Sequence, residues 1–304
     1  MPPAPHVSVA VFAYNEEDGI IACLDAIGAC AGEAEVTVHV LINGSTDGTE
    51  RLVRGYRPNG FALRPVVIKR GDKANAWNVY THEIAPEDAA VHVFTDGDMQ
   101  MAPGSIAGFV ERFAAEPEAN GCAGLPITGR SREQFRRKLR EKREMAGNLY
   151  ALRVRCVMAF RQRGVRLPVG MIGEDGLVTA LVKYDLDTLG PRRDERIGLS
   201  ERGGFAYASL SPLRSADRRI YRNRRIRYAV RRQQDNMLYP LLFSKGVQAM
   251  PAHVVDLYRQ NHALMELRWN GLDTYFDWVA CKRIRRDILA ADRAKEEERA
   301  HLYS

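Results

Sequence analysis

Hydrophobic and polar positions follow two different periods along the first 130 residues. Short runs rich in Val and Ile alternate with segments in which apolar residues recur every three or four positions, as in an amphipathic helix. The runs predict strands over residues 7–13, 35–42, 66–69 and 91–95, and the periodic segments predict helices that begin near Ile20 and that cover residues 73–84. Strands that alternate with helices favour a mostly parallel sheet with helices on both faces.

Beyond about Gly121 the pattern is mainly helical. The predicted elements are a short strand within 121–129, one long arginine-rich helix over 132–163, a helix over 174–184 and a last strand over 207–210. Helical periodicity returns after Pro212 and continues into a charged tail. We therefore predict an α/β domain in residues 1–212 and a helical C-terminal region in residues 213–304.

The composition is that of a globular protein. Of the 304 residues, 27% are charged and 45% hydrophobic, which excludes a wholly disordered chain and a polytopic membrane protein. There is no run of 18 or more apolar residues, and the first residues lack the features of an export signal. The five cysteines form no CxxC pair, so neither a disulfide framework nor a zinc ribbon is indicated. We expect a cytoplasmic protein.

Lysine and arginine are concentrated in two stretches. Residues 130–166 contain thirteen Lys and Arg against three Asp and Glu, and residues 214–232 contain nine against one. These stretches carry net charges of +10 and +8, which leaves −11 for the remainder of a chain whose net charge is +7. A basic surface on an otherwise acidic protein indicates an anionic partner, which is a phosphate-rich ligand, an acidic membrane surface or nucleic acid.

The fourth predicted strand ends in an acidic motif, Asp96-Gly97-Asp98. Carboxylates at i and i+2 of an extended segment project from the same side, and the glycine between them lets a ligand approach the backbone. At the carboxyl edge of a parallel sheet, such a pair suits a hard divalent cation that also holds phosphate oxygens. Alone, the tripeptide is more typical of an acidic turn that caps a helix, and only the other motifs change that interpretation.

Three further motifs precede the acidic pair along the chain. They are Tyr14-Asn15-Glu16-Glu17 after the first strand, NGSTDGT over 43–49 after the second, and GDKANAWN over 71–78. With these four motifs in this order, residues 6–230 resemble glycosyltransferase family 2. The family has the GT-A fold, a Rossmann-like, mostly parallel sheet flanked by helices. The resemblance implies a nucleotide-binding half in residues 1–100 and an acceptor half in residues 101–212.

The resemblance also implies a donor site. The first two motifs would cradle the nucleoside, the lysine motif would lie near the base and diphosphate, and the acidic pair would bind Mn²⁺ or Mg²⁺ on the sugar nucleotide. The residues so assigned to the nucleotide sugar are Ala13, Tyr14, Asn15, Glu16, Asn43, Ser45, Asp47, Lys73, Asn78, Asp96, Gly97 and Asp98, with Asp98 and Asp96 also on the metal. Asn43 departs from the family, which often has Asp there, so an amide or the backbone would make the base or ribose contact.

A fifth motif, MIGEDGLV over 171–178, resembles the Glu-Asp pair that follows the donor site in inverting members. The resemblance makes Asp175 the catalytic base and Glu174 its neighbour on the acceptor side. Inverting transfer needs one carboxylate to take the proton of the acceptor hydroxyl as that hydroxyl attacks the anomeric carbon. Asp175 near a helix N-terminus should stay ionised, because the terminal N–H groups favour the anion. Taken alone, the pair is also typical of a helix cap.

The second basic stretch contains a sixth motif, Arg224-x-x-Arg227-Tyr228. It is similar to the (Q/R)xxRW signature of processive synthases and ceramide glucosyltransferases, with Tyr228 in the tryptophan position. The similarity assigns Arg224, Arg227 and Tyr228 to the nucleotide sugar, since arginine forks onto a diphosphate and an aromatic ring stacks on a sugar. In so basic a segment, a solvated or lipid-facing Arg224 is an equal alternative.

Processive synthases normally continue into transmembrane helices, and this chain has no such run, so we expect single-sugar transfer. The expected donor is a UDP-sugar, and the expected acceptor is a polysaccharide precursor or a lipid-linked saccharide. Apolar residues between the basic ones fit an anionic bilayer at the inner face of the membrane as well as ordinary surface helices. The apolar patch at 237–243 leaves a dimer open.

Three other functions are compatible with parts of the sequence. A nucleotidyltransferase shares the sheet and the acidic metal site, but it normally shows a glycine-rich loop with Arg or Lys after the first strand, which is absent. A nucleic-acid-binding protein would use the basic stretches, although no RNA or DNA motif is present. An inactive scaffold is disfavoured because the acidic motif positions are filled.

Overall fold

The computed structural model describes all residues except 1–3, 33, 208–214, 270 and 303–304. The chain forms two compact units. The first unit consists of Met1–Arg166 with Gly173–Ser209, and the second of Leu167–Ile172 with Leu210–Ser304. The first unit contains the sheet, and the second is built from helices.

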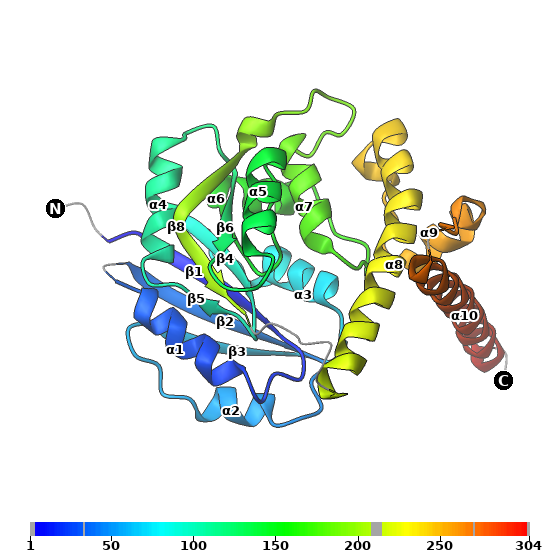
Figure 1. The fold of residues 1–304 in the computed structure, drawn as a ribbon, viewed down its shortest axis with the longest axis horizontal. Coiled ribbons are helices and arrows are strands. Elements are labelled where there is room, and N and C mark those ends of the chain that lie inside the picture. Colours follow the sequence, from blue (N-terminus) through cyan, green and yellow to red (C-terminus); the bar gives the residue numbers. More distant parts are fainter. Residues whose placement is uncertain (1–3, 33, 208–214, 270, 303–304) are drawn as a thin grey trace. The chain divides into compact units, whose positions relative to one another are not determined.

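One mixed sheet organises the first unit, with its strands in the order β3-β2-β1-β4-β7-β6-β8-β5 (Figure 1). The strand bounds are β1 (His6–Ala13), β2 (Glu35–Asn43), β3 (Ala62–Ile68), β4 (Val91–Asp96), β5 (Gln100–Met101), β6 (Gly121–Pro126), β7 (Leu149–Arg153) and β8 (Ile197–Ala206). Strands β1 to β4 pair in parallel, whereas β7 runs antiparallel to β4 and β6. The strand order reverses between β1 and β4, which is where open α/β sheets bind their ligands.

Helices lie on both faces of this sheet. Their bounds are α1 (Ile20–Cys30), α2 (Thr49–Gly55), α3 (Lys73–Val79), η1 (Tyr80–Ile84), α4 (Ser105–Ala115), α5 (Arg132–Lys142), α6 (Val154–Gln162), α7 (Glu174–Lys183) and η2 (Asp194–Arg196). Val7, Val9 and Val11 of β1 belong to the same core cluster as buried residues of α1 and α4. On the other face, Phe12 and Trp77 both stack on Phe94. The two-residue period of β1 thus supplies a core on each side.

The predicted α/β fold and the strands around β1, β2, β3 and β4 are confirmed, and so is the helix at 174–184. The prediction of a single helix over 132–163 is wrong. Along the chain, strand β7 separates helices α5 and α6. Leu149–Arg153 forms a strand because it occupies the position between β4 and β6 in the sheet and is buried there. Of the predicted strand at 207–210, only Tyr207 is described, and it follows the end of β8 at Ala206; residues 208–210 lie outside those described.

The second unit is helical, as predicted for the C-terminal region. Its elements are α8 (Ser215–Lys245), η3 (Val247–Ala249), α9 (Val254–Asn261), η4 (His262–Leu264) and α10 (Leu272–Leu302). Ala229 and Val230 of α8 pack with Ala280 of α10. Asp277 of α10 forms an ion pair with Arg232 at 2.8 Å. Among the described residues, no helix is both long and apolar enough to span a bilayer.

Candidate active site

The carboxyl ends of β1, β2 and β4 bring most of the predicted donor-site motifs together. β1 lies between β2 and β4, and the three strands end at Ala13, Asn43 and Asp96. The buried Asn43 amide donates to the Ala13 carbonyl at 2.9 Å. Asn43 therefore ties two strand ends together, which uses one of its donors inside the protein.

The loops that follow β1 and β2 are held to each other by reciprocal hydrogen bonds. The Asn15 N–H donates to Ser45 Oγ at 3.1 Å, and Asn15 Oδ1 accepts from the Thr46 N–H at 2.8 Å. The Glu17 N–H donates to Asp47 Oδ2 at 3.1 Å. Asn15 has a φ of 54°, which Asn tolerates better than most residues. The predicted nucleoside motifs thus form one pre-ordered double loop.

The lysine motif lies against this double loop. A Cβ on Gly71 would lie 3.0 Å from Cε2 of Tyr14, whose side chain is 55% exposed. A Cβ on Gly44 would lie only 2.5 Å from the Gly71 nitrogen. The backbones of the second and third motifs are therefore in direct contact at Gly44 and Gly71. The ring of Tyr14, from the first motif, lies against Gly71 and is exposed to solvent.

Acidic side chains gather where β4 ends. A Cβ on Gly97 would lie 3.3 Å from Cγ of Glu16, so Glu16 lies directly above the acidic motif. Burial, together with the charges of Asp98 and Asp96, raises the pKa of Glu16 to about 8. Burial also raises the pKa of Asp96 above its usual value, although the Lys73 ammonium opposes this shift. Three carboxylates, of Glu16, Asp96 and Asp98, thus lie close enough to influence one another at this edge of the sheet.

Lys73 connects the acidic motif to the Glu-Asp motif. It is the first residue of α3, whose N-cap Asp72 accepts from the Asn75 N–H at 2.7 Å. Its ammonium forms an ion pair with Asp96 and a second one with Glu174 at 2.8 Å. The two carboxylates raise the pKa of Lys73 above its usual value despite burial. Lys73 is thus a fixed positive charge between β4 and α7.

The Glu-Asp motif forms the first turn of α7, as predicted, with Gly173 as N-cap at a φ of 80°. Glu174 is buried. Asp175 Oδ2 accepts from the Gly147 N–H at 3.0 Å, and the Gly147 carbonyl accepts from Lys73 at 3.3 Å. Helix N-termini favour carboxylates through their free N–H groups. The structure therefore joins Asp96, Lys73, Glu174 and Asp175 in one polar cluster.

Gly147 is a member of this cluster that the sequence analysis missed. It lies just before β7, within the segment predicted to be one helix. A Cβ there would lie 3.2 Å from the Lys73 ammonium. The Gly147-Asn148 pair is a turn signal, and it indicates a break in the helix at this point.

Four further predicted site residues lie on α3 and α8. Asn78 is 3% exposed on the inner side of α3. Arg224, Arg227 and Tyr228 lie on α8, in the second unit. Their assignment to the nucleotide sugar stays a prediction.

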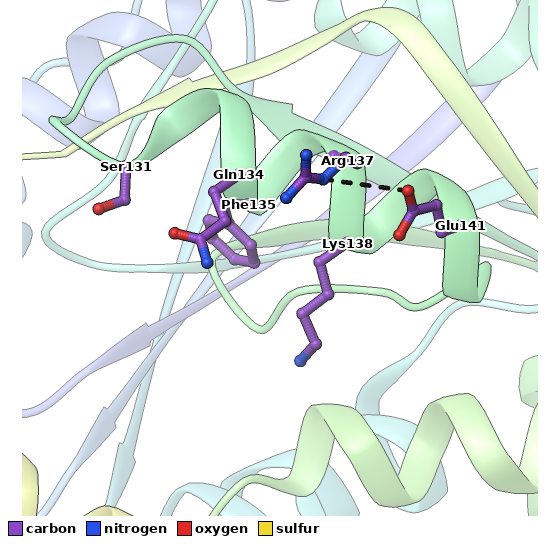
Figure 2. A pocket seen from close by; sticks show the side chains of 6 residues that line it. All are labelled: Ser131, Gln134, Phe135, Arg137, Lys138 and Glu141. Atoms are coloured by element: carbon purple, nitrogen blue, oxygen red, sulfur yellow. Dashed lines mark ion pairs between the residues drawn. The ribbon is translucent and has the colours of Figure 1, made fainter.

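Two shallow pockets lie elsewhere on the first unit. One, of about 300 Å³, is lined only by α5 and the preceding Ser131, with Arg137, Lys138 and Glu141 among its side chains (Figure 2). The other, of about 370 Å³, is lined by residues that include Arg155 and Asp185. Neither contains a predicted site residue.

Comparisons with known proteins agree with this geometry. A family model described as Glycosyl transferase family 2 matches residues 8–167, which is more than half of the chain. A structural comparison finds a mannosyltransferase from Pyrobaculum calidifontis, solved with GDP-Man and Mn²⁺. The TM-score is 0.61 at 22% identity, over 99% of this chain and 81% of that one.

It also finds residues 1–349 of TarS from S. aureus, solved with UDP. The TM-score is 0.50 at 16% identity, over 95% of this chain and 92% of that one. No curated protein matches the sequence. The structural likeness shows the fold, and the family match covers the first four motifs, whereas the motifs at 171–178 and 224–228 lie beyond the matched residues. The chain belongs to glycosyl transferase family 2 and is a glycosyltransferase with the GT-A fold.

Proposed function

We propose that this glycosyltransferase moves one sugar, with inversion, from a nucleoside diphosphate sugar to an acceptor hydroxyl, and that the reaction needs a divalent metal. The observation that carries the proposal is the Lys73 ammonium, which binds the last residue of β4 on one side and the first residue of α7 on the other. A donor held at Asp96 and Asp98 would therefore lie next to the carboxylates of α7. GDP-Man and UDP in the two similar structures support a nucleotide-sugar donor.

The acidic edge fits a hard divalent cation. Burial, together with the charges of Asp98 and Asp96, raises the pKa of Glu16, and a cation at this edge would offset the effect of those charges. The described residues include no group of three or more His, Cys, Asp or Glu side chains arranged to hold a metal, so two carboxylates would have to share it with donor phosphates. Asp98 and Asp96 would hold Mn²⁺ or Mg²⁺, as Mn²⁺ is found in the similar mannosyltransferase. When bound, the metal stabilises the charge of the departing diphosphate.

Asp175 is the proposed base. It lies in the first turn of α7, and its Oδ2 accepts from the Gly147 N–H at 3.0 Å, which fixes the position of the carboxylate. In the transfer step, the acceptor oxygen forms a bond to the anomeric carbon and gives its proton to the Asp175 carboxylate. The bond from the anomeric carbon to the diphosphate oxygen breaks, and its electron pair leaves with the diphosphate. Attack from the side opposite the leaving group inverts the configuration.

Glu174 and Lys73 are proposed as positioning residues for this transfer step. The buried Glu174 is neutralised by Lys73, which leaves Asp175 as the more accessible carboxylate of the pair. We further propose that Arg224, Arg227 and Tyr228 contact the diphosphate or the acceptor. The proposed donor is a UDP-sugar, and the proposed acceptor is a polysaccharide precursor or a lipid-linked saccharide at the cytoplasmic face of the membrane.

The test combines nucleotide binding with product analysis. Calorimetry with UDP, GDP and dTDP, each with and without Mn²⁺, should detect metal-dependent binding of one nucleotide. Asp98→Ala should abolish that binding, whereas Asp175→Asn should retain it within about threefold and lose transfer by at least about 10³-fold. Asp88→Ala is the matched control, because Asp88 is an exposed aspartate just before β4, at the opposite end of the strand.

Several results would contradict the proposal. Equal loss of nucleotide binding in both site variants would remove the distinction between donor site and base. An NMR spectrum showing retained anomeric configuration in the product would exclude a single inverting displacement. Release of inorganic diphosphate would point to nucleotidyl transfer.

A further inference from the structure

Helix α10 has an outward face of unusual composition. Its exposed members follow one another at helical spacing, and they are Leu272, Tyr275, Trp278, Lys282, Arg285, Arg286, Leu289 and Arg293. Leu272 is 74% exposed, Tyr275 44% and Trp278 46%. Residues three and four apart share one side of a helix, so these side chains form a single stripe. We call these eight residues the α10 stripe.

The stripe contains four cations and no carboxylate. Up to residue 293, α10 has four acidic residues, and each is in an ion pair. Asp273 pairs with Arg225, and the fully buried Asp277 pairs with Arg232 and Arg268. Asp287 pairs with its neighbours Arg283 and Arg286, and Asp292 pairs with Arg259. Up to residue 293, the helix therefore keeps its negative charge in local pairs, and the stripe presents positive charge to solvent.

Large apolar side chains extend this surface toward the start of the helix. Trp269, just before α10, is 88% exposed, and Leu267 and Leu264 are 41% and 43% exposed. The Lys282 ammonium lies 3.9 Å from the ring centroid of Trp278, so cation and ring are in contact. Leaving two indoles and several leucines in water is unfavourable, and such patches mark interaction sites.

We infer that the α10 stripe, together with Trp269, is a docking surface for an anionic lipid bilayer. Tryptophan and tyrosine rings settle at the level of lipid head groups, where one edge is apolar and the other hydrated. An interfacial helix combines Trp and Leu with Lys and Arg in this manner, and each cation near an anionic leaflet adds attraction. The absence of carboxylates from the stripe matches a negative surface. None of the residues of the α10 stripe is among those assigned to the proposed donor site.

The basic stretch at 130–166 offers a contrast. Arg136 and Arg140 both pair with Glu201, and Arg153, Arg155, Arg161 and Arg163 donate to backbone carbonyls. Its apolar residues Leu139, Leu149 and Leu152 are buried. This stretch stabilises the first unit and does not present an apolar surface with its charge.

Vesicle binding of the full chain tests the inference. Vesicles of phosphatidylcholine with one quarter phosphatidylglycerol should retain the protein in a flotation assay, and pure phosphatidylcholine should not. Lys282→Glu with Arg285→Glu should weaken retention more than about tenfold. The matched control, Arg137→Glu with Lys138→Glu on the exposed side of α5, has the same change in charge and should stay within about twofold of the parent.

Fluorescence gives a second readout that requires no variant. The protein has three tryptophans, and Trp77 is fully buried, so quenching by brominated lipids reports on Trp269 and Trp278. Quenching by bromine near the head groups supports the inference. It is overturned by absent binding of the folded protein, by equal binding to neutral vesicles, or by equal loss in the control. A dimer that forms without lipid and is lost in Trp269→Ala would instead identify a second copy as the occupant.

Discussion

At the scale of single residues, Glu16 shows how the acidic edge of the sheet lowers the stability of the folded protein. Its Cγ would lie 3.3 Å from a Cβ on Gly97, and burial, together with the charges of Asp98 and Asp96, raises its pKa from 4.5 to about 8. A carboxyl whose pKa is higher in the folded than in the unfolded state does not affect the free energy of unfolding below the unfolded-state pKa. As the pH rises from that value to the folded-state pKa, the free energy of unfolding falls. Ionised Glu16 is therefore unfavourable at pH 8 and absent at pH 4.

We expect Glu16→Gln to raise the melting temperature more at pH 8 than at pH 5, measured with EDTA present to keep the acidic edge free of metal. The exposed Glu35, at the opposite end of β2, is the control, and Glu35→Gln should show no such pH dependence. A Glu16→Gln effect that is equal at both pH values would show that the pKa of Glu16 is not raised in the folded protein.

Gly44 supplies a second prediction at this scale. It has a φ of 71°, and a Cβ there would lie 2.5 Å from the Gly71 nitrogen and 2.6 Å from its Cα. Since both contacts are with backbone, Gly44→Ala should lower the free energy of unfolding by about 2–4 kcal/mol. Gly55→Ala is the control, because nothing lies within 4 Å of that position, and it should change stability by less than about 1 kcal/mol. The free energies of unfolding of both variants, measured by urea denaturation, test this prediction.

At the scale of elements, the first basic stretch acts by tying helix and strand ends together. The Arg153 guanidinium, at the end of β7, donates to the carbonyls of Phe113, Glu116 and Ala119 around the C-terminus of α4. It also lies over the Phe113 ring at 4.8 Å. Carbonyls at a helix C-terminus lack partners within the helix, and a cation there opposes the negative end of the dipole.

Arg153→Met should therefore destabilise the protein by about 2–4 kcal/mol in urea denaturation, since several charge-assisted hydrogen bonds are lost together. Arg137→Met on α5 removes an arginine whose exposed ion pair with Glu141 is 3.9 Å long. That change should cost less than about 0.5 kcal/mol. An equal loss of unfolding free energy in the two variants would mean that the hydrogen bonds of Arg153 at the end of α4 do not contribute to stability.

At the scale of the whole molecule, the two units have separate cores, and Asp277 belongs to the second. It is fully buried between Arg232 and Arg268, at 2.8 and 2.9 Å. Burial alone would raise its pKa, but hydrogen bonds from the two arginines hold it below the usual value. Asp277→Asn should therefore cost about 3 kcal/mol, because two arginines lose their charged partner.

The separation of the cores predicts where that loss appears. In hydrogen exchange, amides of α8 and α10 should lose protection in Asp277→Asn, whereas amides of β1, β2 and β4 should keep it. Loss of protection throughout the sheet would show that both units unfold as one.

The sequence by itself determined the alternation of the first 130 residues, the α/β architecture and the acidic strand end, because these depend on local period and composition. It also placed Asp175 in the first turn of a helix, since that depends on neighbours a few positions away. It could not find β7, because a short apolar run serves a strand or a buried helix equally well. The gap between β4 and β6, which decides between them, exists only in the folded sheet.

Only the tertiary structure decided which polar groups meet. Lys73, Asp96, Gly147 and Glu174 are far apart in the chain, and no local pattern encodes a contact between them. The same holds for the basic residues. Arg153 and Lys282 look alike in the sequence, yet one donates to carbonyls at a helix end and the other lies exposed beside Trp278. Whether a charge is paired or presented to a partner depends on distances that folding alone creates.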